Sequence, residues 1–473
     1  MRGIRRDGEQ GRLVAATLLG GDATPVAARL AANGPDAWIA FDQEVRRVHS
    51  RSYGTLSTER IEARLCDPDG RIRAAALAAW RNPPLQLVLI RCADWVPAVR
   101  DRARRVLGRA VAKDPVGALI ALAPLVLRLG RREHGAWGLE QLEASLSGRY
   151  SLLAAWWRPG QPSTTWSWNS LTGGQRAVVL SRLSEGADLP ARRFAARVTL
   201  AAGPVDVRET ARRAAAERDP LTSRIWTDGA LAAMAGEGPD DVAVDALLGA
   251  HLPLARAAGV TALRRAGRAR EAGDHLADRS GMVRACARWL MRQDGGDPCA
   301  HYRALVEDPA RVTGYAVTGF VECGGPGGPG GSGRSEDAAV LHALLSHPAG
   351  PVRAAAVAGL RERGGCDQTL LLAMLDDPSP SVAREVARSL LDSARRLPTA
   401  WLAECAAPGR PLHTRRAAFR LLRAQGGVGA LRAAVDLLTV LDPALRAQAA
   451  DTLWDSPDPH RRARHFARLG LAG

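Results

Sequence analysis

One short pattern recurs along the chain and limits what it can fold into. The pattern is Asp, four residues, Val or Ile, Arg, two residues and Ala, and it occurs in residues 67–80, 94–107 and 278–290. Ile72 and Val99, which hold the same place in the first two copies, are 27 residues apart. A repeat of this kind predicts a chain built from copies of one small structural unit rather than around one large core.

The residues of each copy fit a pair of helices joined by a turn. Pro follows the signature Asp in several copies, and Pro ends a helix because it lacks the N–H that a continuing helix needs. The Asp carboxylate can cap the next helix by accepting from its first N–H groups. Apolar residues then recur at helical spacing, as in Ile72, Ala76 and Leu77. One pair cannot bury such a stripe alone, so the pattern predicts an all-α fold in which helix pairs stack into a superhelical α-solenoid.

The pattern resembles the HEAT repeat, in particular its short bacterial form, which phycobilin-lyase-like proteins also contain. Clear copies cover residues 55–110 and 338–455, and weaker ones cover 186–322. The resemblance implies that the second helices of the pairs line the concave side of the solenoid. It also implies a structural ladder between adjacent repeats, made of Asp67 and Arg73, Asp94 and Arg100, and Asp278 and Arg284. His347 and Ala383 replace signature residues, so we expect the ladder to be interrupted there.

Two segments break the repeat and divide the chain. Residues 131–185 lose its rhythm and are rich in Trp, and residues 323–335 contain a run of Gly, Pro and Ser that cannot hold a helix. We therefore expect an N-terminal HEAT-like array, a Trp-rich insertion, a degenerate HEAT-like array, a Gly-rich linker or loop, and a C-terminal HEAT-like array. Their expected bounds are 1–130, 131–185, 186–322, 323–335 and 336–473.

The Trp-rich insertion is a candidate binding segment. Its candidate partner-binding residues are Trp156, Trp157, Arg158, Trp166 and Trp168. Trp and Arg side chains often anchor protein interfaces, and Trp rings also stack on nucleic acid bases. The alternative is that these rings cover an exposed end of a helical stack, because Trp is more often buried than bound to a ligand.

Arginine dominates the charge of the chain. There are 65 Lys and Arg against 49 Asp and Glu, a net charge of +16, which favours an anionic partner. A guanidinium is a planar fork that suits carboxylate or phosphate. Arginines recur at helical spacing on the expected second helices, as Arg102, Arg105 and Arg109, as Arg264, Arg265 and Arg268, and as Arg416, Arg420 and Arg423. The alternative is a solvated face with local Asp and Glu partners.

No residue pattern indicates catalysis. The seven cysteines are irregularly spaced without C-x-x-C, and the sequence contains neither His-Glu-x-x-His nor Gly-x-Ser-x-Gly. We therefore expect no catalytic residue, metal site or cofactor. The cysteines are expected to be reduced thiols that act as small apolar residues. With no secretory signal and no run long enough to span a membrane, this predicts a cytoplasmic protein.

These observations predict a non-catalytic HEAT-repeat scaffold that binds an acidic protein partner through its concave or edge surface. The alternative is a nucleic-acid-binding solenoid that uses an arginine-rich concave face. A third function, a HEAT-like DNA glycosylase or a lyase, rests on shared fold class, basic charge and Trp and Asp content. Those glycosylases place Trp, Asp and Arg together, and no local motif in this sequence assigns such a trio.

Overall fold

Helices make up all the regular structure in the described part of the chain. The computed structural model describes residues 2–22, 24–51, 60–79, 83–147, 171–203, 205–324, 334–365, 367–437 and 443–454. Over these residues it contains 28 helices, two of them 3₁₀ helices, and no strand. The all-α prediction is thus confirmed for the described residues.

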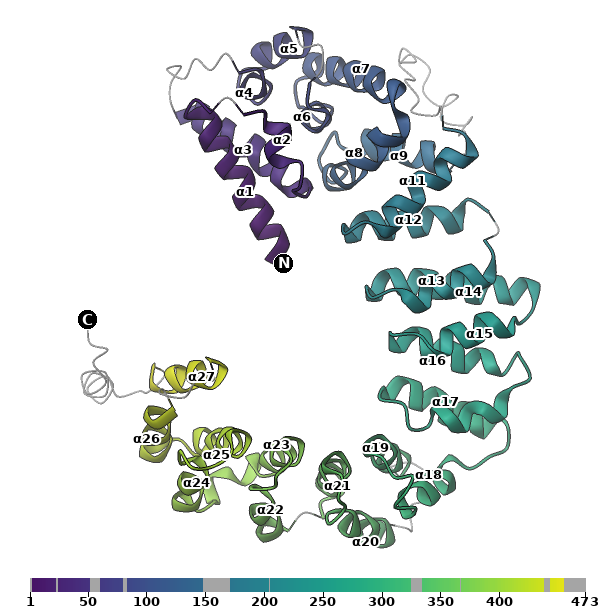
Figure 1. Cartoon of the computed structure of the whole chain (residues 1–473), viewed down its shortest axis with the longest axis vertical. Coiled ribbons are helices and arrows are strands. Elements are labelled where there is room, and N and C mark those ends of the chain that lie inside the picture. The colour runs from purple at the N-terminus through teal and green to yellow at the C-terminus, as the bar shows by residue number, and fades with distance from the viewer. Residues whose placement is uncertain are drawn as a thin grey trace. The chain divides into compact units, whose positions relative to one another are not determined.

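The chain folds as two compact units, Met1–Gly259 and Val260–Gly473 (Figure 1). The helices of the first unit are α1 (Arg2–Leu19), α2 (Val26–Leu30), α3 (Pro35–Arg51), α4 (Ile61–Leu65), α5 (Gly70–Ala79), α6 (Leu85–Arg91), α7 (Pro97–Lys113), α8 (Pro115–Leu129), α9 (Ala136–Ser147), α11 (Gly173–Glu185), α12 (Leu189–Ala201), α13 (Val207–Ala216), α14 (Pro220–Glu237) and α15 (Asp241–Leu248). Helix α16 (Pro253–Leu263) carries the chain from the first unit into the second.

The second unit continues with two 3₁₀ helices among its α-helices. Its elements are η1 (Ala269–His275), α17 (Gly281–Gln293), α18 (Pro298–Glu307), α19 (Gly314–Cys323), α20 (Arg334–Leu344), α21 (Gly350–Glu362), α22 (Gln368–Met374), α23 (Pro380–Ser389), η2 (Leu391–Arg396), α24 (Thr399–Ala406), α25 (Leu412–Gln425), α26 (Gly427–Leu437) and α27 (Pro443–Trp454).

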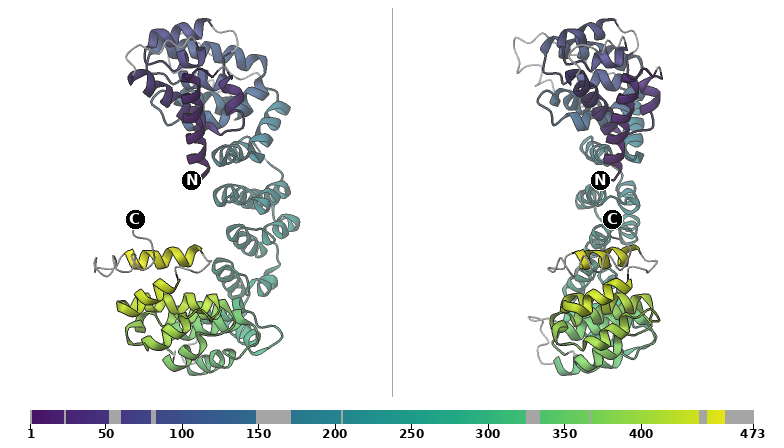
Figure 2. Two further views of the ribbon diagram at one scale, coloured as in Figure 1. Left: turned by 60° about the vertical axis from the view of Figure 1, so that its left-hand side comes forward. Right: turned by 90° about the vertical axis from the view of Figure 1, so that its left-hand side faces the viewer.

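Helices of the second unit pack both on their neighbour in the chain and on the next helix but one. Helix α21 packs on α19 and α23, and α23 packs on α25, so these four helices form one layer. Figure 1 shows α18, α20, α22 and α24 on the other side of this layer. The turned views of Figure 2 show the helices of each unit lying side by side. Because α19 precedes the glycine run and α21 follows it, the layer continues across that run.

Aspartate and proline begin many of these helices, but the expected cap by the signature Asp is wrong, because α7 and α17, which follow Asp94 and Asp278, have no side-chain cap. Seven Asp side chains accept a hydrogen bond from a backbone N–H of the first turn that follows: Asp114, Asp188, Asp206, Asp219, Asp240, Asp297 and Asp367. Pro stands in the first turn of α7, α8 and α23, among others. A backbone N–H at this position would have no acceptor within the helix, so its absence costs no hydrogen bond.

Small residues allow the helices to approach one another closely. The side chains of Val382, Ala383 and Val386 on α23 are completely buried. At Gly319 on α19, an added Cβ would lie 2.2 Å from the ring of Tyr302 on α18. Tyr302 is itself fully buried and donates its hydroxyl proton to the carbonyl of Leu276 at 2.6 Å. The glycine therefore sets the contact distance between these two helices.

Candidate partner-binding groove

The second unit contains a basic groove, which we call the arginine groove. Helices α23, α25 and α27 line it, and each is the second helix of a consecutive pair. Its volume is about 490 Å³, and its lining residues are Pro380, Arg384, Ala387, His413, Arg416, Ala417, Arg420, Arg423, Ala444 and Gln448. Three of the predicted arginines, Arg416, Arg420 and Arg423, are thus brought together in one groove.

The amphipathic sequence of α25 places these arginines on its solvent side. Residues 416, 420 and 423 are separated by four and three positions, so they lie on one face of the helix. The opposite face is buried through Ala418, Phe419 and Leu422. Burial of that apolar face therefore fixes the rotation of α25 and, with it, the direction of the arginines.

Three of the four arginines in the arginine groove have no partner among the described residues, whereas Arg416 interacts with another part of the chain. The groove lining includes four arginines and no Asp or Glu. Among the described residues, Arg384, Arg420 and Arg423 are exposed and have no hydrogen bond or ion pair. His413 is held in place by a contact from its Nε2 to the carbonyl of Asp377, at 3.0 Å. The groove thus presents guanidinium groups that are available to a partner of opposite charge.

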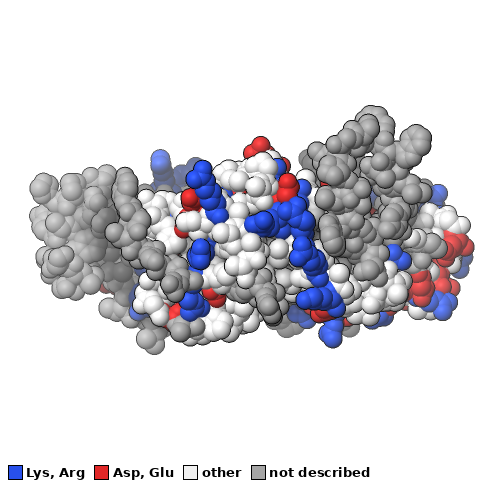
Figure 3. Space-filling model, turned by 90° about the horizontal axis from the view of Figure 1, so that it is seen from above, with Lys and Arg blue, Asp and Glu red and all other residues white. Residues whose placement is uncertain are grey.

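The other predicted arginine groups have a different environment. Arg102, Arg105 and Arg109 lie along α7, and Figure 3 shows Lys and Arg side chains in a stripe on the side of the first unit that carries α5 and α7. Arg102 donates to the carbonyl of Ala74 at 3.0 Å, so it also joins two helices. Arg105 is half-buried and Arg109 is exposed.

The group at residues 264–268 is engaged within the chain. The guanidinium of Arg264 lies 5.6 Å from the centre of the Trp289 ring. Arg268 forms two hydrogen bonds with Glu271, both at 2.7 Å. Arg265, the remaining member, also has an interaction with the rest of the chain. These residues therefore resemble the solvated, locally paired alternative more than a binding surface.

The two ends of the Trp-rich insertion form α9 and α11, but its candidate binding residues fall between them. Trp156, Trp157, Arg158, Trp166 and Trp168 all lie outside the described residues, as does most of the glycine run, residues 325–333.

The signature arginine has two partners, one within its own repeat and one in the next. Arg73 donates through Nη1 to the backbone carbonyls of Asp67 and Pro68, at 2.7 and 2.8 Å. Its Nε and Nη2 donate to the carboxylate of Asp94, at 2.9 and 2.7 Å. Arg100 likewise donates to the carbonyl of Asp94 at 2.9 Å. Each Asp of the ladder therefore offers its carbonyl to its own Arg, and Asp94 offers its carboxylate to the Arg of the preceding repeat.

The same arrangement occurs elsewhere with other acceptors. Arg284 donates to the carbonyl of Asp278 at 2.7 Å, and its other nitrogens donate to Glu322, which the sequence pattern did not single out. Arg193 makes the two-bond contact with Asp219, at 2.9 and 2.7 Å. Asp219 stands 26 residues after Arg193 and Glu322 stands 38 residues after Arg284, so only the fold identifies the carboxylate that each Arg meets.

The interruption expected at His347 is wrong for the arginine that follows it. Arg353 donates to the carbonyls of His347 and Pro348 at 2.7 and 2.9 Å, and to the carboxylate of Asp377 at 2.9 and 2.7 Å. The contact survives because any residue supplies the backbone carbonyl. The ring of His347 also accepts from the N–H of Ala349 at 3.1 Å, as an Asp would. At Ala383 the guanidinium is missing, so that position has nothing to donate.

The expectation that all cysteines are reduced thiols is wrong for two of them. Cys299 and Cys323 form a disulfide that joins α18 to α19, with their Cα atoms 5.7 Å apart. The fold brings them together across 24 residues of chain, which no local spacing signals. Cys66, Cys92, Cys286 and Cys405 are free thiols, and burial raises the pKa of the Cys405 thiol to about 11. Such thiols are poorly reactive.

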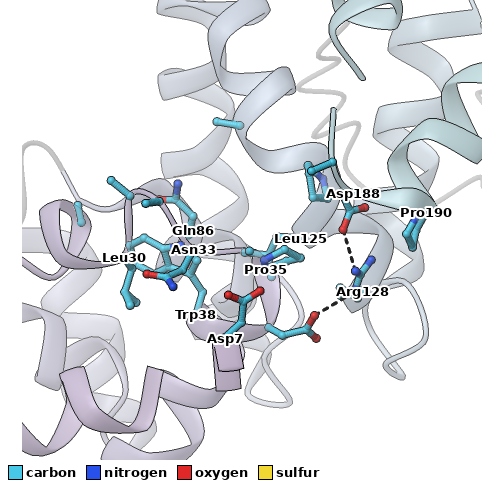
Figure 4. A pocket seen from close by; sticks show the side chains of 18 of the residues that line it. Asp7, Leu30, Asn33, Pro35, Trp38, Gln86, Leu125, Arg128, Asp188 and Pro190 are labelled. Atoms are coloured by element: carbon cyan, nitrogen blue, oxygen red, sulfur yellow. Dashed lines mark hydrogen bonds and ion pairs between the residues drawn. The ribbon is translucent and has the colours of Figure 1, made fainter. Parts of the chain in front are cut away.

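The largest cavity described lies in the first unit and has the opposite charge balance to the arginine groove (Figure 4). Its volume is about 910 Å³, and Leu30, Trp38 and Leu125 contribute apolar surface to it. Arg128 approaches Asp188 at 2.8 Å and Asp36 at 3.6 Å, while Asp7 adds a third carboxylate. An anionic partner is therefore disfavoured in this cavity.

No protein-family model matches the sequence, and no curated protein matches it. Within the described residues, no group of three or more His, Cys, Asp or Glu side chains could hold a metal ion. None of the helices that the structure describes is both long enough and apolar enough to cross a bilayer.

Proposed function

We propose that this protein is a HEAT-type α-solenoid that acts as a non-catalytic scaffold in the cytoplasm and binds an acidic segment of a protein partner in the arginine groove. The observation that carries the proposal is the groove itself, with four arginines and no acidic side chain in its lining. The repeated Arg-to-Asp contacts between successive helix pairs support the solenoid. The four free thiols favour a reducing compartment, whereas a disulfide is typical of an oxidising one, so the redox state of Cys299 and Cys323 in cell extracts tests this location.

The geometry of the groove favours an acidic helix as the bound segment. Along α25, Arg416 and Arg420 are separated by about 6 Å of helix axis and Arg420 and Arg423 by about 4.5 Å, because each residue adds about 1.5 Å. Glutamates at positions i, i+4 and i+7 of a partner helix have the same spacing. Ala387, Ala417 and Ala444 leave room for that helix to approach. Helices that lie in grooves are a common mode of protein recognition.

A nucleic acid would use the same arginines but not the alanines between them. Phosphate contacts give affinity without requiring close packing, and they weaken steeply as salt rises. The two partners are therefore separated by competition. A duplex that displaces the peptide and binds more tightly than it, at every salt concentration, would favour the nucleic acid and contradict this proposal.

The proposal is tested with a fluorescently labelled helical peptide that carries glutamates at i, i+4 and i+7 and alanines between them. We expect it to bind the wild-type protein, as measured by fluorescence anisotropy. The triple variant Arg384→Glu, Arg420→Glu and Arg423→Glu is expected to weaken binding by about tenfold or more, because charge-assisted contacts become repulsive. These three arginines have no ion pair to lose among the described residues, so the variant is expected to fold.

A matched control changes the same amount of charge in the same unit. Arg395, Arg396 and Arg432 are exposed and lie outside the groove lining. Reversing all three to Glu should leave peptide affinity within about twofold of the wild type, apart from a long-range effect that 0.15 M salt screens. Equal losses in the two triple variants would mean that overall charge, and not the groove, attracts the peptide.

A further inference from the structure

A second cluster of arginines lies in the first unit, around a small cavity that we call the Arg132 pocket. Its volume is about 320 Å³. Helix α3 contributes Asp42 and Arg46, the end of α6 contributes Arg91, and the turns before α7 and α9 contribute Trp95 and Arg132. The proposed scaffold function makes no use of these residues.

The two carboxylates of the Arg132 pocket already have arginine partners. Asp94 receives the two-bond contact from Arg73, and the side chains of both residues are 0% exposed. Asp42 accepts from Nη2 of Arg91. Arg91 also approaches Asp94, with Nη1 at 3.4 Å from Oδ2. Arg73 and Arg91 therefore already balance the charges of the two acidic side chains, so Arg46 and Arg132 give the pocket a net positive charge.

Two buried guanidinium N–H groups next to the pocket have no acceptor. The Nε atoms of Arg46 and Arg91 are buried and make no hydrogen bond within the described chain. Arg91 is only 2% exposed, and the nearest carboxylate oxygen to Nε of Arg46, in Asp42, is 3.7 Å away. A buried donor without an acceptor costs free energy, so a bound acceptor at this place would be stabilising.

Arg132 adds a further positive charge to this cluster. Among the described residues, its guanidinium has no hydrogen bond or ion pair. Burial lowers the pKa of Arg132; the negative charge of Asp42 acts against this shift, and the positive charge of Arg91 adds to it. A guanidinium that is partly removed from water and left unpaired is unfavourable unless an anion accompanies it.

We propose that the Arg132 pocket binds the phosphoryl group of a phosphorylated ligand, held by Arg46, Arg91 and Arg132. A phosphoryl group offers three acceptor oxygens, which matches several unsatisfied guanidinium donors better than a single carbonyl does. The cavity is larger than a bare ion and reaches the lower end of the range for small-molecule sites. Trp95, which is 58% exposed, gives the organic part of the ligand an apolar surface at the pocket.

The Trp95 ring is itself oriented by the cluster. The guanidinium carbons of Arg46 and Arg73 lie 4.7 and 4.5 Å from the ring centre, within the range of cation–π contacts. Since Arg73 is also anchored by Asp94, the ring, the buried pair and the free arginines form one connected arrangement. An anion that binds Arg46 would therefore change the environment of the Trp95 ring.

The proposal is tested by calorimetric titration of the wild-type protein with inorganic phosphate, with adenosine monophosphate and with a short DNA duplex. Adenosine serves as the neutral probe. The test variant is Arg132→Gln, and the control is Arg131→Gln, an exposed neighbour that does not line the pocket. We expect phosphate or the monophosphate to bind, adenosine to fail, and Arg132→Gln to weaken binding by about tenfold or more.

The stability of the variants separates a binding role from a structural one. Without ligand, Arg132→Gln is expected to melt at the wild-type temperature or above it, because an unpaired, partly buried charge is removed. If only the duplex binds in an Arg132-dependent way, the phosphoryl group belongs to a nucleic acid backbone. If no phosphate probe binds, if adenosine binds as well as its monophosphate, or if Arg132→Gln binds like the wild type, the proposal is overturned.

Discussion

The Arg132 pocket and the arginine groove are both rich in arginine, but the two regions use it differently. At the pocket, Arg91 is buried and paired with Asp42, and Asp94 of the lining is paired with the buried Arg73, so these pairs hold helices together. In the groove, four arginines line a surface that contains no acidic side chain. The buried pairs of the first region contribute to the fold, while the exposed arginines of the groove leave their charge to an outside partner.

The comparison shows that a count of arginines says little about binding. The buried pairs differ from the groove arginines in that a carboxylate from another helix or turn lies within reach of each guanidinium. Breaking a buried pair leaves an uncompensated charge, whereas changing an exposed arginine leaves the core intact. Removing the carboxylate of a buried pair should therefore cost stability, whereas reversing the exposed arginines of the groove should cost binding, and the predictions below follow from that.

The largest effect is expected at Asp94. Replacing Asp94 with Ala leaves Arg73 buried without its carboxylate and weakens the environment of Arg91 as well. We expect the free energy of unfolding of the first unit to fall by about 3–5 kcal/mol, measured by urea denaturation. Asp101→Ala, which changes an exposed Asp on α7, serves as the control. A loss for Asp94→Ala no larger than that for Asp101→Ala would mean that the buried pair does not stabilise the unit.

A smaller, pH-dependent effect is expected at the Arg193–Asp219 pair, which is less buried. Hydrogen bonds from Arg193 hold the pKa of the Asp219 carboxyl well below its usual range. The stabilisation is therefore fully present above the unfolded-state pKa of about 4 and is lost as the pH falls toward the folded-state pKa. Between pH 5 and 3, the unfolding free energy of the wild type should fall more steeply than that of Asp219→Asn. Parallel curves would contradict this role of the pair.

The smallest effect on stability is expected in the arginine groove. The triple variant Arg384→Glu, Arg420→Glu and Arg423→Glu should change the unfolding free energy by no more than about 0.5 kcal/mol per site, as is typical of surface substitutions. Thermal denaturation of this variant and of the control variant Arg395→Glu, Arg396→Glu and Arg432→Glu would measure the change in stability. A large drop specific to the groove variant would mean that these arginines stabilise the second unit, as Arg73 does the first.

Part of this arrangement could be predicted from sequence. Helical spacing alone put Arg416, Arg420 and Arg423 on one face, and the repeat located the turn that Arg73 contacts. Arg384 and His413 could not be assigned to the groove, because their place depends on how successive helices pack. For the same reason, the sequence does not identify Glu322 as the acceptor of the Arg284 guanidinium.

The Arg132 pocket shows more clearly what the sequence alone cannot predict. Arg132 and Arg46 lie outside the repeat signature, and their sequence neighbourhood does not reveal burial or a missing acceptor. Trp95 follows a signature Asp, yet the sequence pattern gave no sign that its ring would meet two guanidiniums. The disulfide between Cys299 and Cys323 escaped prediction for the same physical reason, since contact between distant residues is decided by tertiary packing.

The most direct test of the central claim is an exchange of charge between the groove and its partner. A second peptide, with lysine in place of each glutamate, is titrated against the wild type and against the variant Arg384→Glu, Arg420→Glu and Arg423→Glu. We predict that the wild type binds the glutamate peptide, that the variant binds the lysine peptide, and that the two crossed combinations bind at least about tenfold more weakly. Binding of the glutamate peptide to the reversed groove with wild-type affinity would contradict the claim.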